Sequence, residues 1–227
     1  MLYQHIYKKE ITTMARTIEP HPAGKFYGTP ATSMSGREFQ KKFGSANTRS
    51  GAIGEQKLFE VLRGRNGWLP AHIPLFCSLH TPGADSADID FAVVNGNKIL
   101  LIDAKFWRQN TGFVWNLGDD GENLFEGIRR WKSKNGTNYK FSRSMIMAKK
   151  NIKKALPGFQ VESIVIMVTD HKYKNTRLPN TRFLTAPGGV KVLNMKTAKK
   201  YIAKYFKGTE RTTDTYNAEI FLDKYTQ

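Results

Sequence analysis

The sequence has one cysteine, Cys77, among 227 residues, so no disulfide bond can form within the chain. Disulfide-free chains are typical of reducing compartments, and we therefore expect an intracellular protein, in the cytoplasm or the nucleoid. No apolar run approaches the ~18 residues that a membrane-spanning helix needs, and the first residues lack the apolar stretch of a signal peptide. We expect no membrane partner.

Acidic residues are also scarce, because 19 Asp and Glu stand against 36 Lys and Arg, for a net charge of +17. The imbalance lies in residues 129–211, which hold 21 basic residues and only three acids, Glu162, Asp170 and Glu210. Such a basic region attracts polyanions, of which nucleic acid is the commonest. The alternative is a lysine-rich surface that is merely solvated.

Several catalytic signatures are missing. The five histidines show no zinc-like spacing with one another or with Cys77. The sequence has no Gly-x-x-x-x-Gly-Lys phosphate loop, no Gly-rich dinucleotide fingerprint and no serine nucleophile elbow. These absences disfavour an ATP-driven or hydride-transferring enzyme.

The hydrophobic pattern predicts an α/β fold. Pro and Gly interrupt residues 1–34, which we expect to form an extended arm. An apolar stripe predicts a helix that Ser50 caps and Gly64 ends. The other predicted elements are strands at 72–78, 88–94, 98–106 and 161–169, a helix at 144–156, weaker strands at 182–185 and 190–193, and a basic helix at 197–206. This order predicts a central mixed sheet flanked by helices, with a core at 35–170 and a basic C-terminal extension at 171–227 packed on it.

Asp103 and Lys105 follow directly on the apolar run Ile99–Ile102. That run is apolar on both faces of the predicted strand, which indicates a central strand covered on both sides. A spacing of two puts both charged side chains on one face. Burying these charges costs several kcal/mol unless they are paired or bound to a metal ion, so something must compensate them.

Two more carboxylates stand on the preceding strand, at Asp88 and Asp90. Asn95-Gly96 predicts a two-residue hairpin turn, which places Asp88 opposite Asp103 and makes Asp90 its diagonal neighbour. Carboxylates that converge in a half-buried place are ligands for a hard divalent cation. An ammonium group beside them can act on a water molecule and balance phosphate charge.

These residues resemble the signature of the PD-(D/E)xK nuclease superfamily, and in particular its NERD (nuclease-related domain) branch. Gly51-Ala52-Ile53-Gly54-Glu55 is similar to that branch's Gly-x-x-Gly-Glu helix start. Ile89-Asp90 is similar to its Ile-Asp strand, and Ile102-Asp103-Ala104-Lys105 to its acidic-x-Lys strand. The aromatic-rich segment that follows is Phe106-Trp107 with Gly112-Phe113-Val114. The resemblance covers about residues 51–115, and more loosely extends to about 168.

The resemblance implies a restriction-endonuclease-like core and a metal-dependent endonuclease, with DNA as the favoured substrate. It implies that Asp90 and Asp103 bind Mg²⁺ or Mn²⁺ and that the main-chain carbonyl of Ala104 completes the ligand set. Glu55 is implied to join through a water molecule or a second ion. The implied role of Lys105 is to orient the attacking water and to stabilise charge during phosphodiester hydrolysis.

The sequence departs from the family pattern in two places. The family usually has Glu where Asp103 stands, and its Asn-Pro-x-x-Gln helix start is absent, with Met145 or Met147 at the Gln position. One alternative is therefore a non-catalytic nucleic-acid-binding or assembly protein that keeps the fold. Another is an RNA-processing nuclease. The oligomeric state is left open.

Nucleic-acid contacts are expected from basic residues near the predicted helix at 144–156. They are Arg129, Arg130, Lys149, Lys150, Lys153 and Lys154. The alternative for the four lysines is the solvated face of a helix. Glu55 has the alternative role of an acid that interacts with the helix dipole, and Asp103 with Lys105 that of a surface ion pair.

Overall fold

In the computed structural model the described residues are 25–31, 45–64, 66–84, 88–107, 115–117, 123–126, 139–140, 144–169, 181 and 185–227. The predicted arm at 1–34 lies mostly outside them, and its described part contains β1 (Phe26–Tyr27). Arg129 and Arg130 also lie outside the described residues. So do the predicted domain boundaries at residues 34 and 170, and the division of the chain stays a prediction.

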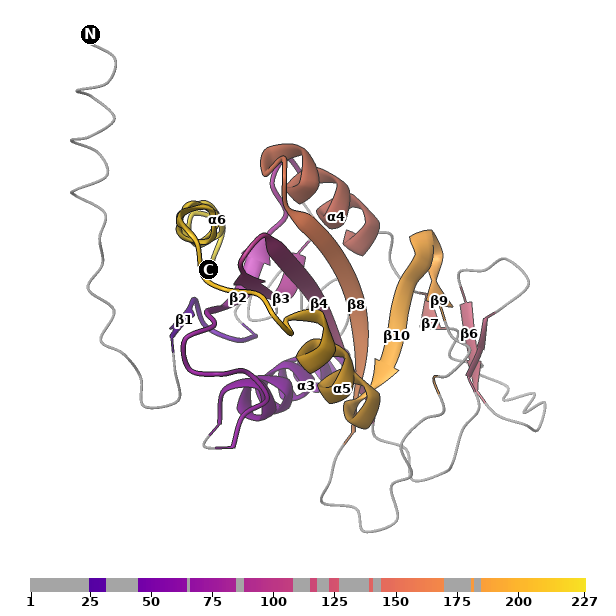
Figure 1. Cartoon of the computed structure of the whole chain (residues 1–227). Helices are drawn as coiled ribbons and strands as arrows, with labels where there is room; N and C mark the ends of the chain where they lie inside the picture. Colours follow the sequence, from indigo (N-terminus) through magenta and orange to yellow (C-terminus); the bar gives the residue numbers. More distant parts are fainter. Residues whose placement is uncertain are drawn as a thin grey trace, which may run out of the picture.

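A mixed seven-stranded sheet forms the centre of the described fold (Figure 1). In spatial order its strands are β1, β2 (Leu75–His80), β3 (Asp88–Asn95), β4 (Lys98–Trp107), β8 (Gln160–Thr169), β10 (Val190–Asn194) and β9 (Thr185–Ala186). β2, β3 and β4 are antiparallel neighbours, whereas β4, β8 and β10 are parallel. A separate three-stranded sheet contains β5 (Trp115–Leu117), β6 (Asn123–Glu126) and β7 (Tyr139–Lys140). The expected α/β fold with a central mixed sheet is confirmed.

Helices cover both faces of the seven-stranded sheet (Figure 1). α3 (Ser45–Arg63) and α5 (Met195–Tyr205) pack on one face, and α4 (Ser144–Ala155) and α6 (Thr213–Asp223) pack on the other. The predicted start of α3 at Ser50 is wrong by more than a turn, because no Pro or Gly between residues 45 and 49 breaks the helix. Its predicted end before Gly64 is confirmed.

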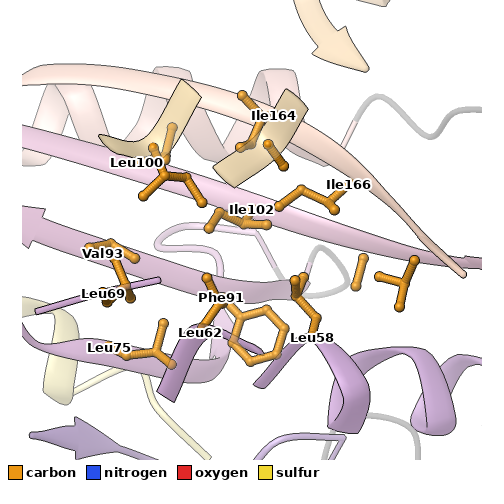
Figure 2. Close-up of a cluster of buried hydrophobic side chains, with 14 of the residues drawn as sticks. Leu58, Leu62, Leu69, Leu75, Phe91, Val93, Leu100, Ile102, Ile164 and Ile166 are labelled. Carbon is orange, nitrogen blue, oxygen red and sulfur yellow. The ribbon is translucent and has the colours of Figure 1, made fainter. Parts of the chain in front are cut away.

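The run Ile99–Ile102 in β4 is fully buried, as the sequence predicts. β4 lies between β3 and β8, and helices cover it from both sides. Figure 2 shows the cluster on the α3 side, where Phe91 from β3 lies with Leu58 and Leu62 from the helix. Each such side chain contributes about 1.5–3 kcal/mol when it is fully buried, so this cluster holds α3 against the strands that carry the charged residues.

The hairpin between β3 and β4 turns at Gly96-Asn97 rather than at Asn95-Gly96. Asn95 pairs with Lys98 across the turn, and Gly96 has the positive φ of 56°. Glycine at the first turn position fits this backbone because it has no Cβ. Asn95 stays in the strand, where its side-chain amide donates to the hydroxyl of Thr209 at 2.7 Å and to its carbonyl at 3.1 Å.

The predicted hairpin register was therefore wrong by two residues. The paired residues run from the turn to Phe91 opposite Ile102. Because the shift is even, every side chain keeps its predicted face. Continued by one step, the register brings Asp90, and not Asp88, opposite Asp103.

The C-terminal residues belong to the same fold. β10 pairs with β8, and α6 contributes Ala218 and Leu222 to the cluster under α4. Glu219 of α6 is 2% exposed and pairs with Lys25, beside β1, at 2.9 Å and with Arg211. No helix in the described part of the chain is long and apolar enough to cross a membrane.

Gly54 sets how closely α3 approaches β4. A Cβ atom at this position would lie 2.5 Å from the Cβ of Phe106. We expect Gly54→Val to lower the free energy of unfolding by about 2–3 kcal/mol, since the helix must move away from the sheet. Thermal melting should then show a decrease of ~5–10 °C. Gln56→Val, at an exposed position of the same helix, is the control for helix propensity, and an equal loss there would contradict the packing explanation.

Candidate active site

Asp103 and Lys105 form an ion pair near the C-terminal end of β4. The Nζ atom of Lys105 donates to Oδ1 of Asp103 at 2.6 Å. The Asp103 side chain is 12% exposed, whereas that of Lys105 is 36% exposed. The pair therefore opens to solvent on its cationic side, and it differs from the solvated surface pair that is the alternative for these two residues.

Asp90 directs its carboxylate onto the backbone of β4. Its Oδ2 atom accepts a hydrogen bond from the N–H of Ala104 at 2.6 Å. Regular pairing of β3 with β4 runs from the turn to Phe91 and Ile102 and ends there. Beyond that point the Asp90 side chain accepts the hydrogen bond from a backbone N–H of β4. On the other side of β3, Ser78 of β2 has a φ of 49°, which is unusual for a residue other than glycine. The sheet is thus locally distorted beside Asp90.

Glu55 comes to the same place from α3. It is 1% exposed, and its Oε2 atom accepts a hydrogen bond from the N–H of Ala31 at 3.0 Å. The other oxygen, Oε1, is buried and has no hydrogen-bond partner. A buried carboxylate oxygen in this state is expected where a cation or a water molecule binds. This burial also disfavours the alternative role of Glu55, that of an exposed acid that only interacts with the helix dipole.

The electrostatic environment raises the pKa of Glu55 to about 7. Burial is the largest cause, because it disfavours the charged form. The N–H of Ala31 and the ammonium of Lys105 act in the opposite direction, and the charge of Asp103 adds to the increase. Any additional positive charge near the Oε1 atom therefore stabilises the charged form of Glu55.

Asp90 and Lys105 respond to the same cluster of charges. Burial raises the pKa of Asp90 well above its ordinary value, and the charges of Glu55 and Asp103 raise it further against the opposing effects of Lys105 and the Ala104 N–H. Burial lowers the pKa of Lys105, but the charges of Asp103 and Asp90 outweigh it and the net shift is upward. Lys105 is thus held as a cation, and it is one positive charge among three carboxylates.

The donor atoms at this site suit a hard divalent cation. Among the described residues no three His, Cys, Asp or Glu side chains are arranged as a ready-made metal site. Asp90 instead directs one oxygen to the Ala104 N–H, and Asp103 directs one to Lys105. Carboxylate oxygens are nevertheless the ligands that Mg²⁺ and Mn²⁺ prefer, and the unpartnered oxygen of Glu55 adds a buried acceptor.

Asp88 does not face Asp103, contrary to the predicted register. It pairs with His80 of β2, whose Nδ1 atom lies 3.1 Å from Oδ1 of Asp88. The Asp88 side chain is 24% exposed and the His80 side chain 59% exposed. Asp88 is therefore a partly solvated acid at the rim of the site.

The four candidate lysines of α4 lie apart from the carboxylates. Lys149 donates to Glu162 at 3.2 Å, and both side chains are more than a third exposed. Lys150, Lys153 and Lys154 are exposed. None of the interactions found within the described residues joins these lysines to the acidic cluster, so their role in nucleic-acid binding stays a prediction.

The contribution of residues 25–31 to the site was not predicted from the sequence. The Ala31 amide orients Glu55 although the two residues are 24 positions apart. Gly28, with a φ of 72°, and Pro30 indicate a turn here, but no local pattern links this turn to α3. Only the folded sheet, in which β1 pairs with β2, brings this backbone donor to the carboxylate.

The mixed sheet, its flanking helices and the carboxylate–lysine cluster together define a nuclease-like α/β protein. A comparison with known protein families matches residues 50–168 to the nuclease-related domain, NERD. That match covers just over half of the chain and includes Glu55, Asp90, Asp103 and Lys105, and the chain belongs to this family. Comparisons with curated proteins and with solved structures found no match.

The raised pKa of Glu55 has a consequence for stability. An acid whose pKa is higher in the folded state destabilises that state as the pH rises from about 4.5 to about 7, and the penalty stays constant above. We therefore expect Glu55→Gln, measured in EDTA, to raise the free energy of unfolding at pH 8 by up to about 3 kcal/mol. The gain should shrink markedly at pH 5. Thermal melts at the two pH values test this, and an equal effect at both would contradict it.

Proposed function

We propose that this protein is a divalent-metal-dependent nuclease that hydrolyses phosphodiester bonds, with DNA as its favoured substrate. The observation that supports this most is the convergence of Glu55, Asp90 and Asp103 on Lys105 in a half-buried site. Membership of the nuclease-related domain family gives independent support for a nuclease-related function. Burying three carboxylates around one ammonium is costly, and metal-assisted hydrolysis is a reaction that uses such a cluster.

Asp90, Asp103 and the main-chain carbonyl of Ala104 would hold Mg²⁺ or Mn²⁺, and Glu55 would join directly or through a water molecule. When bound, the ion supplies Lewis acidity toward a phosphate oxygen and lowers the pKa of a nearby water molecule. The protein's own contribution is orientation. The N–H of Ala104 fixes one oxygen of Asp90, and the N–H of Ala31 fixes one oxygen of Glu55, so each carboxylate keeps one oxygen for the ligand.

Lys105 would act on the charge that develops during the reaction. Its ammonium is held positive by Asp103 and Asp90, so it serves as a cation that positions the attacking water and stabilises the phosphorane-like charge, rather than as a base. Its partial exposure lets a substrate phosphate approach from the solvent side.

The second candidate function is a non-catalytic nucleic-acid-binding protein on the same fold. Two observations favour it. Asp90 and Asp103 each direct an oxygen to an internal partner, and Met145, at one of the two positions where the family often has Gln, is 3% exposed in the core. A binding protein could retain these internal contacts without ever needing the metal ion.

The assay that separates these functions uses plasmid, linear duplex DNA, single-stranded DNA and RNA. Each substrate is incubated with Mg²⁺, Mn²⁺ or EDTA. Metal-dependent cleavage of DNA is the expected result, whereas cleavage of RNA alone would favour an RNA-processing nuclease. Binding without cleavage in either metal would favour the non-catalytic protein.

Asp103→Asn should abolish binding of Mg²⁺ and Mn²⁺ and leave the fold intact, because a charged ligand becomes a neutral one of the same shape. Isothermal titration calorimetry measures the affinity. Asp88→Asn is the matched control, since Asp88 pairs with His80 at the rim and should keep its metal affinity. If Asp103→Asn binds the ions as tightly as the parent protein, the metal site has been assigned to the wrong residues.

Lys105→Ala should lose cleavage by ~10²–10⁴-fold while it keeps metal and DNA binding, because several other cations support ground-state affinity but none replaces this ammonium at the water. Lys98→Ala is the control, since Lys98 stands at the opposite end of β4 and donates to the carbonyl of Tyr205. Cleavage rates and thermal melts are measured on both variants. Full activity of Lys105→Ala with a lowered melting temperature would show that Lys105 only neutralises Asp103.

A further inference from the structure

α5 presents a face of lysines to solvent. The segment from 188 to 209 contains six lysines and no Asp or Glu, and all six lysines are exposed. Four of them, Lys196, Lys199, Lys200 and Lys204, lie on the helix at spacings of three and four residues, which puts them on one side of it. The opposite side is buried through Met195, Ala198 and Ile202.

These lysines are not neutralised within the described part of the chain. None of the ion pairs there involves a lysine of α5. Like charges four residues apart destabilise a helix by about 0.2–0.5 kcal/mol for each pair. On α4, one of the four lysines, Lys149, pairs with Glu162. The positive field of α5 is therefore available to a polyanion from outside.

α5 begins at the end of the sheet where the candidate active site lies, at the C-terminal ends of β4, β8 and β10. Lys105 of β4 pairs with Met167 of β8, and Met167 pairs with Asn194 of β10. Two strand spacings separate Lys105 from Asn194, or about 10 Å. Because α5 starts directly after Asn194, its first turn stands at the same end of the sheet as the Asp103–Lys105 pair.

The lysines of α4 are farther from this end of the sheet. Glu162, the partner of Lys149, pairs with Leu100, which stands five residues before Lys105 on β4. Five residues of strand extend roughly 16 Å, so this ion pair lies toward the other end of the sheet.

α4 and α5 cover opposite faces of the sheet (Figure 1). Asp103 and Lys105 alternate with Ile102 and Ala104 along β4 and therefore lie on the α4 face. Glu55 comes to them from α3 on the α5 face, so the site stands at the end of the sheet and can be approached from both sides.

Contacts at both ends of α5 hold it against the sheet. Asn194 and Thr197 form a reciprocal capping box at its start. At its end the hydroxyl of Tyr205 donates to the carbonyl of Gln160 at 2.8 Å. Between them Tyr201 carries the ammonium of Lys191 over its ring, 4.7 Å from the centroid. The helix lies beyond residue 168, so this surface is not part of the matched nuclease-related domain.

We propose that the α5 lysine face, formed by Lys196, Lys199, Lys200 and Lys204, binds the phosphate backbone of a DNA duplex whose scissile phosphate lies at the carboxylate site. This inference rests on the proposed function and names the surface that delivers its substrate. Duplex DNA carries a negative charge about every 1.7 Å of its axis, so a helix ~16 Å long can follow several phosphates. The lysines of α4 lie farther along the sheet from the carboxylate site, and we expect them to contribute less to binding of this duplex.

The test compares two quadruple variants that remove equal charge. One is Lys196→Gln, Lys199→Gln, Lys200→Gln and Lys204→Gln on α5, and the other is Lys149→Gln, Lys150→Gln, Lys153→Gln and Lys154→Gln on α4. Fluorescence anisotropy measures binding of a labelled duplex of about 20 base pairs over a series of salt concentrations in EDTA, so that cleavage cannot interfere. Circular dichroism checks the fold, and the double variant Lys196→Gln with Lys200→Gln replaces the α5 quadruple variant if that fails to fold.

For the α5 variant we expect the slope of log affinity against log salt, which is negative, to decrease in magnitude by about 2–4. Each phosphate that the protein no longer neutralises reduces that magnitude by ~0.9. The α4 variant should lower the slope by less than about 1, the value for a single phosphate. An unchanged slope for the α5 variant, an equal decrease for the α4 variant, or no DNA binding by the parent protein would each overturn the inference.

Two further outcomes separate this inference from the proposed function. If DNA binding depends on α5 but neither Mg²⁺ nor Mn²⁺ supports cleavage, the nuclease proposal fails and the binding surface stands. If an RNA duplex of the same length binds through α5 more tightly than DNA, the assignment of DNA as the occupant is overturned.

Discussion

The candidate site depends on one electrostatic constraint, which is that three carboxylates share a single ammonium at the end of a buried strand. β4 must be fully buried to form the centre of the sheet, and Asp103 and Lys105 follow its apolar run directly. Asp90 and Glu55 then converge on the same place, each with a raised pKa. The packing that stabilises the fold therefore crowds carboxylates together at a cost, and the divalent cation that we propose for this site would reduce that cost.

The parts of this arrangement that could be predicted from sequence are those with a local pattern. The run Ile99–Ile102 is apolar at every position, and only a central strand covered on both faces suits it. The spacing of two between Asp103 and Lys105 fixed their common face, and the structure joins them at 2.6 Å. The family resemblance depended on the same short motifs and is confirmed by the match to residues 50–168.

The parts that could not be predicted depend on residues far apart in the chain. The turn at Gly96-Asn97 is supported by the bond from Asn95 to Thr209, 114 positions away, and no property of a two-residue turn signals that partner. The position of this turn determines whether Asp88 or Asp90 lies opposite Asp103. The orientation of Glu55 by Ala31 could not be predicted for the same reason. The donor is a backbone N–H, and the residue type does not indicate which backbone N–H will bind a distant side chain.

The hydrogen bond from Ala31 to Glu55 also links the site to the outer edge of the sheet. The segment that carries Ala31 is held by the N–H of Thr29, which donates to the carbonyl of Gln227, and by pairing of the two-residue strand β1 with β2. Short edge strands open locally at a lower free energy than the central strands of the same sheet. Opening of β1 would remove the amide that orients Glu55, so the local stability of a peripheral strand limits the fraction of molecules in which this carboxylate is in place.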